Sequence, residues 1–393
     1  MLFAARKCIR ERGRKMRIFG MTLRERIRQI DPILFFASLG LSLISIVTIL
    51  GAVDNFGRSK LIMQCAMTVA GMIAVFLIAN LDYRYLVERF SPVLLIGSVA
   101  LLAITLFFGK SGETMETGNR SWLQIPFIGI AIQPSEFVKI AFLCTFSGHL
   151  ERVKNKLNHP LTLLGLLVHA GLIVGLILLS GDLGVALVYF GIILFMLYVA
   201  GVSGWYFLGG GALVVVAVPI LWDFLKPYQQ SRILYGFSPE GGPADIVRQP
   251  LMSREAISRG GLFGRGLFEG GLYEDLAASH TDFIFATVCE KLGFVGGFLV
   301  VAGLVVLAVR LLYLAVKCRD TVGRLICAGI AAVIIVQTFI NLWMCLARFP
   351  VIGLTLPFVS AGGSSMLALY MMMGLAHSVS AHDKKMRFGR DLY

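Results

Sequence analysis

The sequence predicts an all-α polytopic membrane protein of about ten transmembrane helices, with both ends of the chain in the cytoplasm. Of its 393 residues, 57% are hydrophobic and only 15% are charged, whereas about a quarter of the residues of a soluble domain are charged. The charged residues gather in short segments between apolar runs of 18 or more residues. Each such run is long enough to cross about 30 Å of hydrocarbon as a helix.

The apolar runs follow one another through most of the chain. Most of them lack the polar stripe that a helix on a soluble core shows every three to four residues. We interpret residues 33–381 as one transmembrane domain, 1–32 as a basic cytoplasmic segment and 382–393 as a cytoplasmic tail. The predicted spans are residues 33–53, 61–80, 91–109, 133–150, 161–180, 184–201, 205–222, 284–316, 325–347 and 364–381.

The distribution of lysine and arginine sets the orientation. Ten of the 36 basic residues fall within residues 1–31, beside the first apolar run, which favours contact with anionic lipid headgroups over binding of nucleic acid. With this end inside, the cytoplasmic segments together carry 22 lysines or arginines, as the positive-inside rule expects. The first run is too long for a signal peptide and has no small-residue cleavage site, so it is retained as a helix.

The cysteines give no sign of a disulfide framework or a metal site. Their number is odd, and most of them lie inside or beside apolar runs, so we interpret them as small residues that pack between helices. We expect no cofactor, and participation of a divalent cation is left open. The seven positions are 8, 65, 144, 289, 318, 327 and 345.

Several irregular segments interrupt the spans on the outer face. Residues 223–283 form a long polar loop, and shorter segments rich in glycine, proline, serine and tryptophan cover 110–135, 180–184 and 348–363. Non-helical backbone at membrane depth is tolerated only where it is buried in protein or lines a wet cavity. The last segment is therefore interpreted as re-entrant or cavity-lining, and a site shared among these segments is expected on the outer face.

Asp282 lies where the long polar loop becomes an apolar helix. One interpretation is an acid at a helix N-terminus, which favours the helix dipole. The other is a partly desolvated carboxylate at the membrane boundary that accepts a proton. The spacing alone leaves both open.

A second group of candidates precedes the fourth span. Glu136 and Lys139 lie three residues apart and could neutralise each other on one helix face, although charges within a membrane are functional candidates by default. Arg120 and Trp122 lie just upstream, and interfacial packing is the commonest role of such a tryptophan.

Other polar positions carry weaker signals. Asp182 lies at another outer break. Gln337 and Asn341 are four residues apart on one helix and are interpreted as groups that hydrogen-bond between helices. The glycines of residues 259–271 do not match dinucleotide-binding spacing and are interpreted as a flexible or tightly turning loop.

Seven segments of the chain resemble, in the same order, those of a known protein family. The chain resembles the SEDS proteins of bacterial shape, division and sporulation, the RodA, FtsW and SpoVE group, from about residue 30 to 380. This resemblance implies a peptidoglycan glycosyltransferase with ten transmembrane helices that polymerises lipid II outside the bacterial cytoplasmic membrane. It also implies a class B penicillin-binding protein as partner, within a larger elongation or division complex. The segments are 118–122, 133–139, 182–184, 228–233, 260–266, 280–286 and 353–365.

Transferred onto this sequence, the family's catalytic aspartate falls on Asp282, which favours the proton-accepting interpretation. A positioned carboxylate can remove the proton of an acceptor sugar hydroxyl, and the departing pyrophosphate needs cations, for which arginine is well suited. The candidate cations are Arg120, Lys139, Arg232, Arg259, Arg265 and Arg348. The other expected substrate-binding residues are Trp122, Glu136, Asp182, His280 and Ser360, with Glu136 orienting Lys139.

Four positions bear on the subtype. Ala361 stands where the family usually has tyrosine, and Ile352 stands where the division branch often has lysine, which favours a RodA-like, elongation assignment. Leu354-Thr355 points to the other branch, so the subtype stays open.

Two other classes of function remain as alternatives. A lipid II flippase would use many of the same residues, but a carrier places its key charges near the membrane midplane, whereas Asp282 is predicted on the outer face. A scaffold that only binds and activates a penicillin-binding protein is the third alternative.

Overall fold

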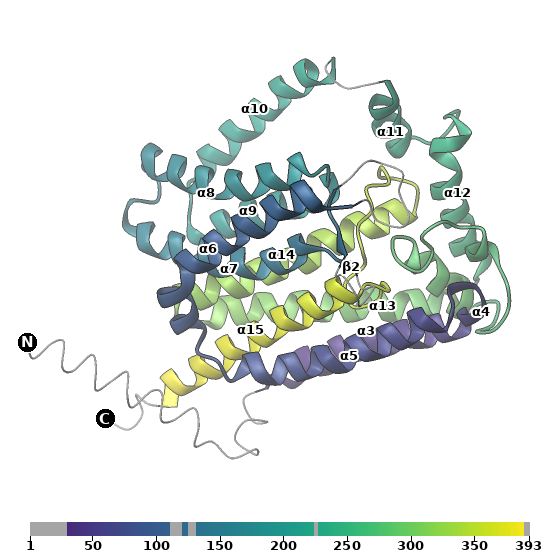
Figure 1. The fold of residues 1–393 in the computed structure, drawn as a ribbon, viewed down its shortest axis with the longest axis horizontal. Helices are drawn as coiled ribbons and strands as arrows, with labels where there is room; N and C mark the ends of the chain where they lie inside the picture. The colour runs from purple at the N-terminus through teal and green to yellow at the C-terminus, as the bar shows by residue number, and fades with distance from the viewer. Residues whose placement is uncertain (1–29, 111–119, 125–130, 224–226, 389–393) are drawn as a thin grey trace, which may run out of the picture.

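The computed structural model describes residues 30–110, 120–124, 131–223 and 227–388. The basic segment predicted for residues 1–32 lies almost entirely outside these ranges, as do the last five residues of the tail and part of the first outer segment. The described chain is mainly helical (Figure 1).

Ten long helices correspond one to one with the predicted apolar runs. They are α3 (Pro32–Gly51), α5 (Arg58–Ala79), α6 (Tyr83–Phe108), α7 (Pro134–Val153), α8 (Pro160–Leu179), α9 (Leu183–Ala200), α10 (Gly204–Trp222), α13 (Ile284–Lys317), α14 (Thr321–Cys345) and α15 (Gly363–Phe388). Within the described residues, seven are long and apolar enough to cross a membrane: α3, α5, α6, α8, α9, α13 and α14. In α10 the apolar stretch is shorter, and α7 carries several charged side chains.

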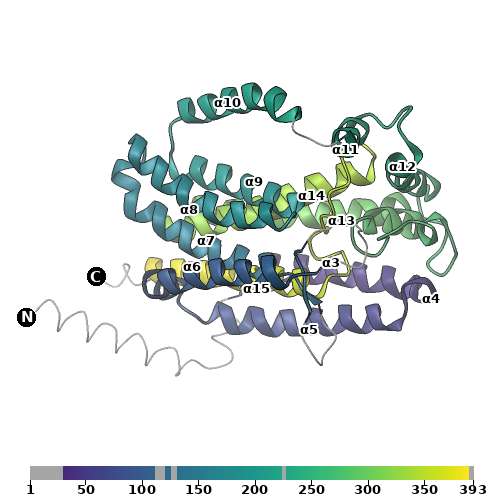
Figure 2. The same ribbon diagram turned by 45° about the horizontal axis from the view of Figure 1, so that its top comes forward.

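The helices form a bundle around α14, which packs against α7, α9, α13 and α15. Helices α3, α5 and α15 lie together on one side. Helix α10 stands apart from the bundle in both views (Figures 1 and 2), and most of its side chains are exposed.

An aspartate side chain caps the N-terminus of several of the long helices. Asp31 Oδ1 accepts hydrogen bonds from the backbone N–H groups of Ile33 and Leu34, at 3.1 and 3.3 Å. Asp182 caps α9 in the same way, and Asp320 caps α14. Such a side chain satisfies backbone donors that a helix start leaves unpaired.

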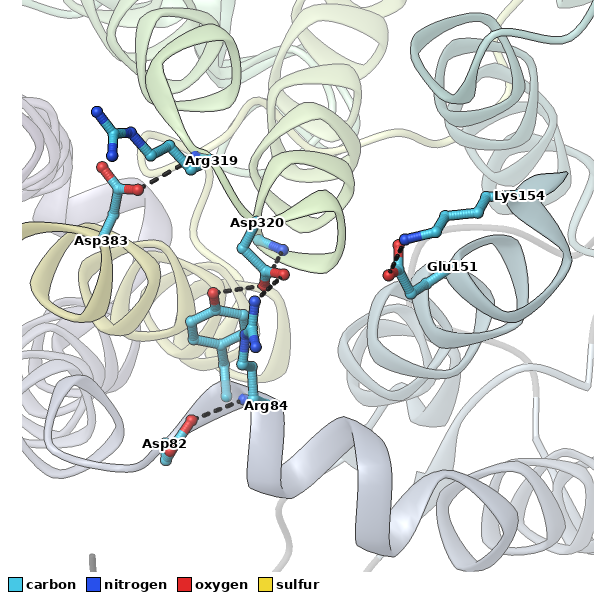
Figure 3. A network of polar contacts seen from close by, with 9 residues as sticks. Asp82, Arg84, Glu151, Lys154, Arg319, Asp320 and Asp383 are labelled. Atoms are coloured by element: carbon cyan, nitrogen blue, oxygen red, sulfur yellow. Dashed lines mark hydrogen bonds and ion pairs between the residues drawn. The ribbon is translucent and has the colours of Figure 1, made fainter. Parts of the chain in front are cut away.

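A network of charged groups joins the starts of α6 and α14 (Figure 3). Tyr83 donates a hydrogen bond of 2.6 Å to Asp320 Oδ2, and Arg84 forms an ion pair with Asp320 Oδ1. Nearby, Asp383 Oδ1 of α15 accepts a hydrogen bond of 3.1 Å from the backbone N–H of Arg319. These contacts fix one end of the bundle.

The segment 223–283 is not the irregular loop that its polarity predicted. It contains α11 (Pro227–Phe237), α12 (Ala244–Arg259) and a short 3-10 helix, η2 (Leu272–Glu274). Helix α12 packs against α13. The sequence interpretation missed these helices because both are short and amphipathic, without the length or hydropathy of a span.

The prediction of an all-α chain also needs a small correction. Strands β1 (Leu123–Gln124) and β2 (Ala131–Ile132) pair antiparallel just before α7. Backbone outside a helix still needs hydrogen-bond partners, and this pairing provides them. The other short elements are α4 (Val53–Phe56) and a 3-10 helix, η1 (Lys154–Lys156).

The glycine-rich segment folds against a kink in α13. Gly293 has a φ of +70° inside this helix, so the next N–H groups turn away from the helical pattern. Phe294 N–H donates to the Gly261 carbonyl at 2.8 Å, and Val295 N–H donates to the Leu262 carbonyl at 3.2 Å. Gly264, with a φ of +84°, lies so close to the Lys291 carbonyl that a Cβ there would overlap it. The glycines therefore permit a tight approach of two backbones.

Two charged side chains of α13 hold the same outer segment. Glu290 accepts hydrogen bonds of 2.9 Å from the backbone N–H groups of Leu272 and Tyr273. Lys291 Nζ donates to the carbonyls of Gly51, Leu267 and Glu269, at 3.0, 2.8 and 3.1 Å. The outer segment is thereby fastened to α13 and to the end of α3.

We expect Gly264→Ala to lower the thermal unfolding temperature of the purified protein more than Gly261→Ala. Both positions have positive φ, which costs a residue with a Cβ about 1–2 kcal/mol. At Gly261 a Cβ would meet open space. The difference in unfolding temperature between the two variants therefore measures the effect of the close approach of Gly264 to α13. Equal losses for the two variants would contradict this account of the loop.

Candidate active site

Asp282 lies directly before α13 and is only 6% exposed. The backbone around it is fixed from two directions. Asn341 Nδ2 of α14 donates a hydrogen bond of 2.7 Å to the Asp282 carbonyl. Ser360 Oγ donates to the Thr281 carbonyl at 2.6 Å, and Ala361 N–H donates to the His280 carbonyl at 2.9 Å. Residues 280–282 are thus held between α14 and the segment 348–362.

Helix capping does not explain Asp282. The N-cap of α13 is Phe283, and no side chain makes a capping hydrogen bond there. Asp282 therefore makes no capping hydrogen bond, although it does place an acid directly before the start of α13.

The pKa of Asp282 is raised to about 6, mainly by burial and also by the nearby Asp182 carboxylate, against the lowering effect of a hydrogen bond with Thr281. A buried carboxylate with a raised pKa is an effective proton acceptor near neutral pH.

Asp182 joins the beginnings of α7 and α9. Its Oδ1 accepts a hydrogen bond of 3.0 Å from Val185 N–H, and its Oδ2 accepts one of 2.9 Å from Gln133 Nε2. Burial raises the pKa of Asp182, whereas the bonds from Val185 and Gln133 lower it. The charges of Glu136 and Lys139 also act on this carboxyl group. The side chains of Gln133, Glu136, Lys139 and Asp182 therefore belong to one region.

Glu136 and Lys139 form the ion pair that their spacing allowed. Lys139 Nζ lies 2.8 Å from Glu136 Oε1, and both side chains are almost completely buried. Beside them, Tyr189 Oη of α9 donates a hydrogen bond of 2.9 Å to the Ser135 carbonyl. A buried ion pair that loses one partner leaves an uncompensated charge, so each residue constrains the other.

The segment 348–362 is non-helical, and all of its residues except Arg348 are buried or half-buried. Asn341 Nδ2 also donates to the Leu354 carbonyl at 2.7 Å, and Ser360 Oγ accepts from Leu356 N–H at 2.7 Å. Ala347 and Phe358 have positive φ angles of 54° and 63°, which are uncommon for residues other than glycine. The two side chains that hold the Asp282 loop therefore also hold this segment.

The candidate cations do not form a single cluster. Lys139 alone among them is buried with the carboxylates. Arg232 of α11 donates from Nη2 to the Val351 carbonyl at 3.2 Å, and Arg348 is exposed at the start of the same segment. These two arginines lie at the border of the segment 348–362.

The remaining cations lie elsewhere. Arg259 is exposed and forms an ion pair of 2.6 Å with Glu255 on α12. Arg265 is 44% exposed, with Nη1 3.9 Å from Glu290 Oε1. Arg120 is exposed, and its N–H donates to the Ser180 carbonyl at 2.9 Å, close to the start of α9.

The two predicted aromatic ligands lie in different surroundings. Trp122 is half-buried and its backbone bridges to Lys110. The His280 ring is half-buried and lies 5.4 Å, centroid to centroid, from the ring of Phe56.

Sequence reasoning assigned one polar residue of this region to the wrong partner and missed two others. Asn341 does not bond to another helix as predicted, but holds the two loop carbonyls described above. Glu290 and Lys291 drew no attention, although adjacent charges inside an apolar run are a recognisable signal. Within the described residues, no group of three or more histidine, cysteine, aspartate or glutamate side chains could hold a metal ion.

Comparisons with known proteins agree with this architecture. The family model for the FtsW, RodA and SpoVE group, described as a cell cycle protein, matches residues 29–385. The probable peptidoglycan glycosyltransferase FtsW of Trichlorobacter lovleyi is 31% identical over 368 residues, covering 91% of this chain and 94% of the relative. The peptidoglycan glycosyltransferase MrdB of Escherichia coli K12 is 31% identical over 363 residues, covering 90% and 94%.

A solved structure gives the same result for the fold. One chain from a study of polymerization and crosslinking by a peptidoglycan synthase complex superposes with a TM-score of 0.77 at 27% identity. The match covers 90% of this chain and 98% of that one. The chain belongs to the FtsW, RodA and SpoVE family of cell cycle proteins, and it is a multi-pass membrane protein.

Proposed function

We propose that this chain is a peptidoglycan glycosyltransferase that polymerises lipid II at the outer face of a bacterial cytoplasmic membrane. The observation that carries the proposal is the buried Asp282, whose backbone is held by Asn341 and whose neighbours are held by Ser360 and Ala361. The glycosyltransferase names of the family relatives support the same reaction.

The proposal includes ten membrane spans with both ends of the chain in the cytoplasm. The basic residues of the predicted inner segments support this orientation. It places Asp182, Asp282 and the segment 348–362 toward the outer face, where the sugar chain grows.

In the proposed mechanism Asp282 is the general base. Its carboxylate takes the proton of an acceptor sugar hydroxyl while that oxygen bonds to the anomeric carbon of lipid II. The bond from this carbon to the pyrophosphate oxygen breaks, and the lipid pyrophosphate leaves with an added negative charge. Arg232 and Arg348, at the border of the segment 348–362, are proposed to stabilise this charge.

The ion pair of Glu136 and Lys139 inside the bundle has a supporting role in this proposal. Glu136 holds Lys139, and the Lys139 charge acts on Asp182, which in turn acts on Asp282. The pair would thus influence the base through electrostatics without contact with the sugar.

We also propose a class B penicillin-binding protein as partner, together with other membrane proteins of an elongation or division complex. The similarity to a chain of a peptidoglycan synthase complex supports an assembly of this kind. The identities of 31% to both FtsW and MrdB relatives leave the elongation and division assignments equally supported.

The first test replaces the base. Asp282→Asn should reduce lipid II polymerisation by the purified chain with its penicillin-binding protein by about 10²–10⁴-fold, the range of general-base catalysis. Asp275→Asn, on an exposed acid of the same outer segment, should leave the rate unchanged. Glycan chains separated on a gel give the measurement.

Three results would contradict the proposal. Full polymerisation by Asp282→Asn would remove the base assignment. Transfer of lipid II across vesicles without polymer formation by the wild-type protein would favour the flippase. Activation of the penicillin-binding protein without polymerisation would favour the scaffold.

The second test uses pH. Because burial raises the pKa of Asp282 to about 6, and a base must be deprotonated, kcat/KM should rise with pH and reach half its maximum near pH 6. An unperturbed aspartate would place this limb near pH 4. A limb at about pH 4 would show that Asp282 does not govern the profile.

The third test removes the anchor of the loop. Asn341→Leu leaves the buried carbonyls of Asp282 and Leu354 without their donor, at a cost of about 1–3 kcal/mol each. We expect kcat to fall while the affinity for lipid II stays near the wild-type value, because the base moves but the substrate surface remains. Asn341→Ser, which keeps one donor, should recover part of kcat. An unchanged kcat in Asn341→Leu would contradict the anchoring role.

A further inference from the structure

Helices α7, α9 and α14 meet at a common level defined by small residues. Gly329 of α14 faces Leu143 of α7 and Met196 of α9, and Gly191 of α9 faces Val336 of α14. Moving toward the outer face, the residue numbers rise along α14 and fall along α9, so these two helices run in opposite directions. Tyr189, in the first half of α9, donates a hydrogen bond to the carbonyl of Ser135, in the first turn of α7. Helices α7 and α9 therefore run in the same direction.

This register brings polar residues together one level further out. Seven residues make nearly two helical turns and about 10.5 Å of rise, so a residue seven positions away lies on almost the same face. Glu136 lies seven residues before Leu143, and Tyr189 lies seven before Met196. On α14 the corresponding position is Val336, beside Gln337. Glu136, Tyr189 and Gln337 therefore occupy the same level of the interface.

Buried polar atoms at this level lack a partner among the described residues. They are Ser135 Oγ, Glu136 Oε2, and both Nε2 and Oε1 of Gln337. The three side chains belong to residues that are 5%, 2% and 1% exposed. Buried polar groups without partners are rare in native proteins and usually mark an ordered water or a ligand.

The chemistry of these atoms selects a small neutral occupant. Glu136 Oε2 and Gln337 Oε1 accept hydrogen bonds, Gln337 Nε2 donates them, and Ser135 Oγ does both. Lys139 disfavours a cation beside Glu136, and Glu136 disfavours an anion. Water matches this mixture, since a buried water makes about three hydrogen bonds to such groups.

We propose that Ser135, Glu136 and Gln337 bind ordered water between α7 and α14. This water donates to Glu136 Oε2, the oxygen that Lys139 does not contact, and so completes the hydrogen bonding of the carboxylate that holds Lys139. The charge of Lys139 acts on Asp182, and the charge of Asp182 acts on Asp282. The inference goes beyond the proposed base, because water binding does not depend on which residue accepts the proton.

The test compares Gln337→Met with Ile334→Met on the same helix. The first removes both amide atoms at similar volume. The second changes a neighbouring buried apolar side chain, a swap that cores tolerate. High-resolution maps of the wild-type protein should show solvent density among Ser135, Glu136 and Gln337, and this density should weaken or vanish in Gln337→Met.

Activity gives a second measurement, which rests on the proposed function. Polymerisation of lipid II should fall about tenfold, the effect of one hydrogen bond to a charged group, while Ile334→Met stays near wild type. Ser135→Ala should show the same changes to a smaller extent.

The proposal is overturned if the wild-type maps show no solvent among these three side chains. It is also overturned if the density persists unchanged in Gln337→Met, or if Ile334→Met loses as much activity as Gln337→Met. The maps do not depend on the role of Asp282, so failure of the base assignment would be recognised separately.

Discussion

Backbone outside a helix must find hydrogen-bond partners within the protein when it lies among membrane-spanning helices. The region around Asp282 depends on this constraint. One amide, Asn341, serves the carbonyls of both Asp282 and Leu354, and one hydroxyl, Ser360, joins Thr281 to Leu356. Two irregular segments that lie far apart in the sequence are therefore fixed against each other, and the position of the candidate base follows from their contact.

The same constraint operates where the glycine-rich segment meets α13. The kink at Gly293 releases two N–H groups, and carbonyls of the outer segment accept them. Glu290 and Lys291 add charge-assisted hydrogen bonds to backbone groups of this segment, which are stronger than those between neutral groups. Charged residues within an apolar helix thus organise the segment that packs against it.

Electrostatic coupling extends from the outer carboxylates into the bundle. Asp282 and Asp182 affect each other, and the buried pair of Glu136 and Lys139 acts on Asp182. In a region of low dielectric such interactions are stronger than in water. The electrostatic environment of Asp282 therefore depends on residues that lie inside the bundle.

The ten long helices and the class of the protein could be predicted from the sequence alone. Ten apolar runs predicted the ten long helices, because a stretch of that length without polar residues has few other stable conformations in a membrane. Local motifs identified Asp282, Asp182 and the pair of Glu136 and Lys139, since each is an ionisable group at the edge of a span or within one. Spacing along one helix was also enough to predict the ion pair.

Only the tertiary structure decided which groups meet. It separated the candidate cations, with Arg259 paired to Glu255 and Arg232 directed to Val351, because sequence order does not fix the distance between different segments. It assigned Asn341 to loop carbonyls and brought Gln337 level with Glu136, which depends on the register of antiparallel helices. Packing between helices sets that register, and no pattern within a single helix contains it.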